Sequence, residues 1–124
     1  MKQLLILIML FPITLLASPS EKIKKSLALW NPLSVQVNSG KIKIVTDEFR
    51  VTDSIYKAII KYGICMPVWS KKPESIEGIN EISVLNKFEK KGYVFKGGRE
   101  LCIAMGKLPD KEADGLLMGN SRLY

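Results

Sequence analysis

Cys65 and Cys102 are the residues of this chain whose chemistry is most narrowly defined. They lie far apart in the sequence, so they lack the C-x-x-C spacing that tunes one thiolate beside another in redox-active pairs. The 124-residue chain contains no histidine, and two thiolates with only carboxylates beside them make a poor zinc site. We therefore predict a structural disulfide between the two cysteines, and we expect neither a metal nor a cofactor.

Catalytic chemistry is restricted by the same lack of histidine. The common Ser-His-Asp and Cys-His mechanisms both require that residue. Asp47 and Glu48 form the best remaining pair for glycosidase chemistry, which needs two carboxylates about 5 to 9.5 Å apart around a sugar bond. Adjacent acids in a loop also cap a following helix or balance a cation such as Arg50. A secreted carboxylate-based hydrolase or toxin-like effector is therefore an alternative to a binding protein.

Basic residues indicate a binding surface. The chain carries 19 Lys plus Arg against 12 Asp plus Glu, a formal net charge of +7. Such a field attracts anionic lipid headgroups, envelope polyanions or acidic proteins. Tryptophan is common both at binding surfaces and in the partial core of small domains, and the core is the favoured interpretation for Trp69. If it is exposed, the nearby disulfide at Cys65 would hold its ring in place as a preorganised contact. The candidate binding surface comprises Trp69, Lys87, Lys90, Lys91, Lys96 and Arg99.

The segment Lys96-Gly97-Gly98-Arg99 has a second interpretation, as an anion-binding turn. Glycines between a strand and a helix allow backbone N–H groups to point toward an anion, and two cations flank them here. The segment has neither the spacing of a Walker A loop nor the G-x-G-x-x-G pattern. A simple strand-to-helix turn accounts for it better.

The first 17 residues have the layout of a secretory signal peptide. Lys2 precedes an apolar run from Leu4 to Leu16, and small residues follow from Ala17 to Ser20. The run is too short for a membrane-spanning helix and Pro12 interrupts it, so we expect cleavage after Ala17, or as late as Ser20. Residues 18–124 would then form one exported domain without a stable membrane span. Its location would be periplasmic or secreted, where disulfides persist.

Two β-hairpins are predicted from alternating apolar and polar residues. The first spans about 34–45 with a turn at Asn38-Ser39-Gly40. The second spans about 81–96 with a turn at Glu89-Lys90-Lys91-Gly92. Because side chains alternate between the two faces of a strand, the core-facing residues of the first hairpin should be Val35, Val37, Ile42 and Ile44.

Two or three short helices are predicted, over about 53–62, 99–107 and 110–118. In the first, Thr52 or Asp53 caps the start and Gly63 ends the helix. Helical spacing predicts a buried face and a wetter face in this segment. The buried face comprises Ile55, Ala58, Ile59 and Tyr62, and the wetter face carries Lys57 and Lys61.

Two further segments are predicted to lack regular structure. Residues 18–25 are polar and charged, which indicates a disordered or frayed start to the exported domain. Residues 66–69 should be extended or looped, because Pro67 disfavours a helical residue before it.

The order of hairpin, helix, hairpin and helix predicts a small α+β domain in which an antiparallel sheet carries helices on one face. The disulfide would join the end of the first helix to the second. By elimination, we expect an exported envelope protein that binds a macromolecular partner, as an inhibitor, an immunity-type protein or an accessory protein. The expected partner is an envelope protein or an anionic envelope polymer, not nucleic acid. A polyanion- or lipid-binding envelope component is the other alternative.

Overall fold

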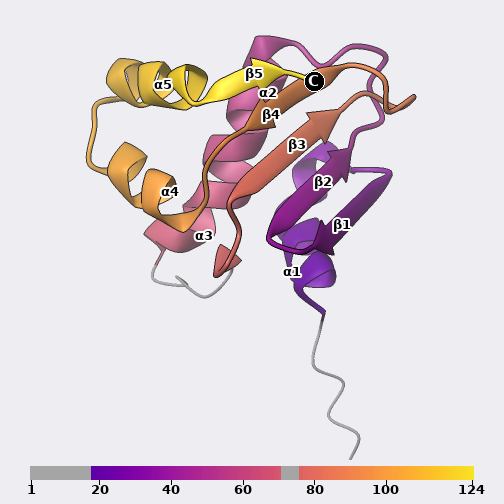
Figure 1. Cartoon of the computed structure of the whole chain (residues 1–124), viewed down its shortest axis with the longest axis horizontal. Coiled ribbons are helices and arrows are strands. Elements are labelled where there is room, and N and C mark those ends of the chain that lie inside the picture. The colour runs from indigo at the N-terminus through magenta and orange to yellow at the C-terminus, as the bar shows by residue number, and fades with distance from the viewer. Residues whose placement is uncertain (1–17, 71–75) are drawn as a thin grey trace, which may run out of the picture.

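Five strands form one mixed sheet in the computed structural model, which describes residues 18–70 and 76–124 (Figure 1). The strands lie in the order β1-β2-β3-β4-β5, which is also their order along the chain. Their bounds are β1 (Ser34–Asn38), β2 (Lys41–Val45), β3 (Glu81–Leu85), β4 (Gly92–Phe95) and β5 (Ser121–Leu123). Both predicted hairpins are confirmed, as β1–β2 and β3–β4, and the α+β class is confirmed with them.

The prediction of a purely antiparallel sheet is wrong, because β2 and β3 are parallel. A helical crossover connects these two strands and returns the chain to the end of the sheet where β2 began. A crossover of this kind produces a parallel pair, whereas a tight turn produces an antiparallel one. The register pairs Ile42 with Ile82 and Ile44 with Val84, so the apolar side chains of both strands face the core together.

The crossover is a continuous helical segment made of α2 (Asp53–Ala58), the π-helix η2 (Ile59–Cys65) and α3 (Met66–Trp69). The Thr52 hydroxyl caps it by accepting a hydrogen bond from the Ile55 N–H at 3.2 Å, as predicted. Gly63 does not end the helix, and residues 66–69 are helical instead of extended. Pro67 lies in the first turn of α3, directly after the π-helix, and the chain continues as a helix through it.

The π-helix changes which side chains face the core. Its wider hydrogen-bonding pattern breaks the 3.6-residue periodicity on which the predicted faces depended. Tyr62 is therefore exposed, and Lys61, which was expected on the wetter side, is buried with 6% exposure. The residues that do face the core are Tyr56, Ile59, Ile60 and Ile64.

The start of the described chain is a helix and not a frayed segment. The helix α1 (Pro19–Ser26) is capped by Ser18, whose hydroxyl accepts a hydrogen bond from the Glu21 N–H. Ile23 and Leu27, four residues apart, are buried against the core. A short 3-10 helix, η1 (Ala28–Trp30), follows. The predicted leader, residues 1–17, lies outside the described residues.

The two remaining helices are α4 (Arg99–Gly106) and α5 (Asp110–Gly119), close to the predicted ranges of 99–107 and 110–118. The disulfide is confirmed: Cys65 of η2 and Cys102 of α4 are bonded, their Cα atoms are 5.0 Å apart, and both side chains are buried. The α2–η2–α3 segment lies behind the sheet in Figure 1, and α4 and α5 lie to its left. Within the described ranges, no helix has the length and apolar character needed to cross a bilayer.

Candidate functional site

The candidate site lies at the end of the sheet where the parallel strands β2 and β3 both terminate. Because the two strands run in the same direction, the loops that follow them, 46–52 and 86–91, leave the sheet side by side (Figure 1). The Thr46 N–H donates to the Leu85 carbonyl at 2.9 Å, and the Lys87 N–H donates to the Glu48 carbonyl at 2.9 Å. The backbones of the two loops are thus joined directly.

Asn86 fixes the two loops to each other. Its side chain is buried, and its Nδ2 donates to the carbonyl of Phe49 at 3.0 Å. Its Oδ1 accepts hydrogen bonds from the backbone N–H groups of Lys90 at 3.0 Å and Lys91 at 3.2 Å. A buried amide with these partners satisfied makes a rigid platform for the side chains that the loops present.

Two aromatic rings stand exposed on this platform. Phe49 is 74% exposed and Phe88 is 55% exposed, and their ring centroids are 5.9 Å apart. The Lys87 ammonium lies over both rings, at 4.5 Å from the Phe49 centroid and 5.7 Å from the Phe88 centroid. Burying a phenylalanine normally stabilises a fold by about 1.5–3 kcal/mol, so leaving two together in solvent indicates a contact surface.

Hollows flank Phe49 on both sides. A groove of about 610 Å³ lies between Phe49 and the C-terminal residues Leu123 and Tyr124. A second hollow of about 400 Å³ lies between Phe49 and Phe88. The Tyr124 N–H donates to the Gly92 carbonyl at 3.0 Å, which continues the β4–β5 pairing to the rim of the groove.

We define the aromatic–basic patch as the exposed apolar and cationic side chains of the 46–52 loop, the 86–91 turn and the C-terminal residues. Its members are Phe49, Arg50, Lys87, Phe88, Lys90, Lys91, Leu123 and Tyr124.

The patch keeps a positive charge. Arg50, Lys90 and Lys91 are exposed, and none of them forms an ion pair with another of the described residues. Glu48, in the same loop as Arg50, is also exposed and makes no ion pair with a described residue, so it offsets one of these three charges. Lys87 lies 4.0 Å from the Asp47 carboxylate, a loose surface pair. Glu89 does not neutralise the patch, because it is hydrogen-bonded to Lys43 of β2 and raises the pKa of that lysine.

The six residues of the predicted binding surface do not lie together. Lys87, Lys90 and Lys91 belong to the patch, whereas Lys96 and Arg99 lie at the opposite end of β4. There the Lys96 ammonium is 3.1 Å from the Glu81 carboxylate, and its hydrogen bond lowers the pKa of Glu81.

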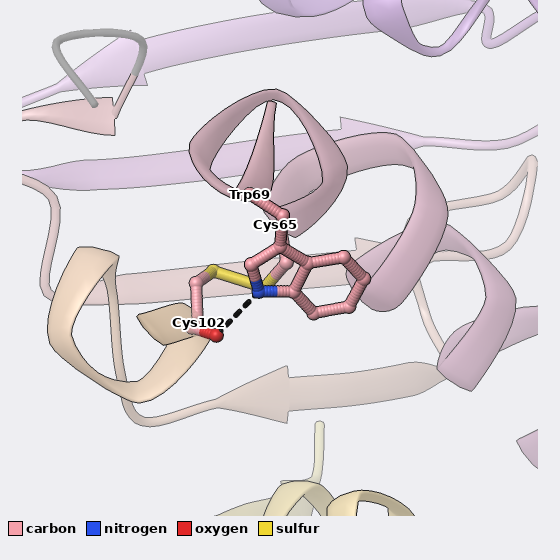
Figure 2. Close-up of a disulfide and its surroundings, with 3 residues drawn as sticks. All are labelled: Cys65, Trp69 and Cys102. Carbon is pink, nitrogen blue, oxygen red and sulfur yellow. Dashed lines mark hydrogen bonds between the residues drawn. A yellow bond between two sulfur atoms is a disulfide. The ribbon is translucent and has the colours of Figure 1, made fainter. Parts of the chain in front are cut away.

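Trp69, the sixth predicted residue, packs beside the disulfide (Figure 2). Its ring is half-buried, and its Nε1–H donates to the Cys102 carbonyl at 2.6 Å. A Cβ atom added to Gly106 would lie 2.6 Å from the same nitrogen, so the indole lies closely over that glycine. The indole N–H is therefore engaged within the fold.

A hollow of about 510 Å³ does lie beside Lys96-Gly97-Gly98-Arg99, at the start of α4. Acidic residues line it together with the cations, namely Glu77 and Glu100. Gly98 has a structural explanation: a Cβ atom there would lie 1.9 Å from the Ile79 carbonyl oxygen, so only glycine allows this close approach of two backbone segments.

Asp47 and Glu48, the predicted carboxylate pair, lie in the loop that carries Phe49. Both side chains are exposed, and Asp47 faces Lys87. Among the residues that the structure describes, no three acidic or thiol side chains gather in a way that could hold a metal ion.

A buried ion cluster joins η2 to α5. The Lys61 ammonium is 2.6 Å from Asp110 and 2.7 Å from Asp114. Burial opposes the charge, but the hydrogen bonds to the two carboxylates outweigh it and raise the pKa of Lys61. Lys61 therefore stays protonated at neutral pH and is unsuited to act as a base or nucleophile.

The predicted surface contained three basic residues of the patch, Lys87, Lys90 and Lys91. It did not contain Arg50, Phe49, Phe88, Leu123 or Tyr124, nor the buried Asn86. Phe88 directly precedes the predicted turn at 89–92, and Phe49 lies between charged residues in the sequence. Asn86, an amide directly before a lysine-rich turn, was the available signal for a fixed loop. Comparison of the chain with protein-family models, with curated proteins and with solved structures yields no match.

Proposed function

We propose that this chain is an exported, disulfide-closed protein that acts by binding a macromolecular partner through the aromatic–basic patch. The observation that carries the proposal is the exposed Phe49–Phe88 pair, held on two loops that the buried Asn86 fixes together. Aromatic and arginine side chains dominate the energetics of protein interfaces, and rigid presentation lowers the entropy lost on binding.

The reactive groups of the chain support binding more than catalysis. Histidine is missing from the sequence, the two cysteines are bonded to each other, and Lys61 is held in its charged form. The patch, in contrast, combines the features of a binding site: apolar rings, a cationic rim and hollows beside them. An inhibitor, an immunity-type protein or an accessory protein would each use such a surface.

Export is supported by the predicted leader and by the disulfide, because such bonds persist in oxidising compartments and are rare in the cytosol. The proposed location is the periplasm or the exterior of the cell. The partner is then a component of the envelope or of its surroundings.

The test is affinity capture from envelope extracts with three forms of residues 18–124, each tagged at the N-terminus because Tyr124 belongs to the patch. They are the wild type, the double variant Phe49→Ser with Phe88→Ser, and the control Leu29→Ser. Leu29 is 90% exposed and lies outside the patch, so its substitution removes an exposed apolar side chain without touching the site.

We expect one protein to be retained by the wild type and the control, and at least ten-fold less of it by the double variant. Equal recovery by all three forms would contradict the proposal, as would the absence of any retained protein. Circular dichroism of the three forms checks that each is folded.

A further inference from the structure

We infer, on the basis of the proposed function, that the partner is a protein that presents an acidic segment with an apolar side chain to the aromatic–basic patch. The acidic side chains would pair with Arg50, Lys90 and Lys91. The apolar side chain would enter the groove between Phe49 and Tyr124.

Charge complementarity gives the sign of the charge on the partner's surface. The cations Arg50, Lys90 and Lys91 are exposed and make no ion pair with the described residues. Among the acids of the same two loops, Glu89 is paired with Lys43 and Asp47 lies near Lys87, so the exposed Glu48 is the acid left to oppose these three cations. A second copy of this chain is a poor occupant, because it would bring the same cations to the interface. An acidic surface instead gains favourable interactions with all three and associates faster through long-range attraction.

The shape of the patch distinguishes a protein from a membrane. A bilayer contacts the side chains that project furthest, whereas a side chain of a protein partner can also occupy the open hollows beside them. Here the groove of about 610 Å³ and the hollow of about 400 Å³ share Phe49 and Lys91 among their lining residues. Each offers aromatic surface next to a cation, which suits an apolar side chain followed by a carboxylate.

A polyanionic polymer would use the charges but not the rings. Its binding would depend on salt throughout, because exposed charges are screened within about 10 Å at 0.1 M ionic strength. Contact between apolar side chains and Phe49 is not screened in this way. We therefore expect binding that weakens by about ten-fold between 50 mM and 500 mM salt and then persists.

The probe is a displayed library of random twelve-residue peptides, selected on the immobilised 18–124 chain and depleted on the Phe49→Ser, Phe88→Ser variant. We expect the enriched peptides to combine several acidic residues with an aromatic or aliphatic one. A library that yields no acidic enrichment, or peptides that bind the depleting variant equally well, would overturn the inference.

One enriched peptide is then measured by fluorescence anisotropy against two variants that change the net charge equally. Arg50→Glu with Lys91→Glu alters the patch, and we expect at least ten-fold weaker binding. Lys107→Glu with Lys111→Glu alters exposed residues at the end of α4 and the start of α5, and we expect less than a two-fold change. Equal losses in both variants would show attraction by net charge alone and contradict the inference.

Vesicles containing phosphatidylglycerol provide the membrane arm. At 150 mM salt, we expect the wild type and the Phe49→Ser, Phe88→Ser variant to sediment with these vesicles equally little. Vesicle binding that requires both rings would overturn the inference in favour of a lipid surface. A captured partner that uses the patch but contacts it with a neutral segment would refute the acidic chemistry alone, leaving the proposed function intact.

Discussion

At the scale of single residues, two of the buried polar side chains join segments that are far apart in the sequence. Asn86 holds the loops of the patch, and Lys61 holds α5 against η2. The polar groups of both side chains are removed from water, so each must be stabilised by its hydrogen bonds. Substituting either residue therefore changes the free energy of unfolding mainly through lost hydrogen bonds, and less through lost apolar packing.

We predict that Asn86→Ala lowers the free energy of unfolding by about 2–3 kcal/mol. Three hydrogen bonds are lost at about 1 kcal/mol each, and the backbone N–H groups of Lys90 and Lys91 lose their acceptor. Urea unfolding measures the change, and amide hydrogen exchange at Lys90 and Lys91 should accelerate. Gln36→Ala, an exposed position on β1, is the control and should change stability by less than about 0.5 kcal/mol. Equal stability of the two variants would contradict the role of Asn86.

We predict that Lys61→Met lowers the free energy of unfolding by about 2 kcal/mol at neutral pH. This is less than the 3–5 kcal/mol typical of breaking a buried pair, because Asp110 is largely exposed. Lys57→Met is the matched control, since Lys57 lies 3.8 Å from Asp114 near the surface and should contribute little. Similar losses in both variants would count against the buried cluster.

Lys61 also predicts that the free energy of unfolding decreases as the pH rises through the alkaline range. Its pKa is raised in the folded state, so its contribution is complete below the usual value of 10.5 and is lost as the pH rises through the higher folded value. Tyr56 also makes the folded state less stable as the pH rises, because burial raises the pKa of its hydroxyl to about 12. Unfolding measured from pH 8 to 11.5 should therefore show a shallower decline for Lys61→Met than for the wild type. Parallel curves would show that Lys61 does not titrate as described.

At the scale of elements, the hairpins were predicted correctly and the pairing between them was not. Alternation of apolar and polar residues is a local signal, so β1–β2 and β3–β4 follow from their own residues. The helix predicted between the two hairpins was a signal for the parallel pairing of β2 with β3, because strands joined by a helical crossover run parallel when they are neighbours. The π-helix η2 left no trace in the spacing of apolar residues, and this reversed the expected positions of Lys61 and Tyr62.

The helix α1 was missed because its apolar content is small. Only Ile23 and Leu27 face the core, and the lysines between them resemble a solvated tail. Its Ser18 cap would be retained by cleavage after Ala17 and lost by cleavage after Ser20.

The β3–β4 turn depends on Gly92. This residue has φ 155°, and a Cβ atom there would lie 2.0 Å from the Val84 carbonyl oxygen. We predict that Gly92→Ala lowers the free energy of unfolding by more than about 2 kcal/mol, because backbone must move to admit the methyl group. Gly115→Ala in α5 is the control: its Cβ meets no atom within 4 Å, and stability should rise by up to about 1 kcal/mol. Thermal unfolding of both variants measures the contrast, and a tolerated Gly92→Ala would contradict this geometry.

The disulfide connects two cysteines that are 37 residues apart in the sequence and belong to different helices, η2 and α4. We predict that replacing both cysteines by alanine lowers the free energy of unfolding by about 4 kcal/mol, mainly because the unfolded chain gains entropy. Urea unfolding of the wild type with and without dithiothreitol should show a comparable loss, and the reductant should leave the double variant unchanged. A loss below about 1 kcal/mol would show that the bond is not structural.

At the scale of the whole molecule, the patch exists only because three distant segments meet. Phe49 follows β2, Phe88 lies in the β3–β4 turn and Tyr124 follows β5. The sequence reasoning identified the lysines of the turn because like charges cluster locally. The aromatic residues had no such signal, because their proximity results from the parallel pairing and from the edge strand β5. The length of β4 itself separates Lys96 and Arg99 from Lys90 and Lys91, which lie at the other end of that strand.

The most direct measurement is photo-crosslinking in intact cells that produce the full chain, with a photoreactive amino acid at position 88 or at position 29. Leu29 is 90% exposed and Phe88 is 55% exposed, so random collisions would favour position 29. We expect a discrete adduct of one mass from position 88 and none from position 29. Adducts from position 29 alone, or identical adducts from both positions, would contradict the claim that this protein works by binding through the aromatic–basic patch.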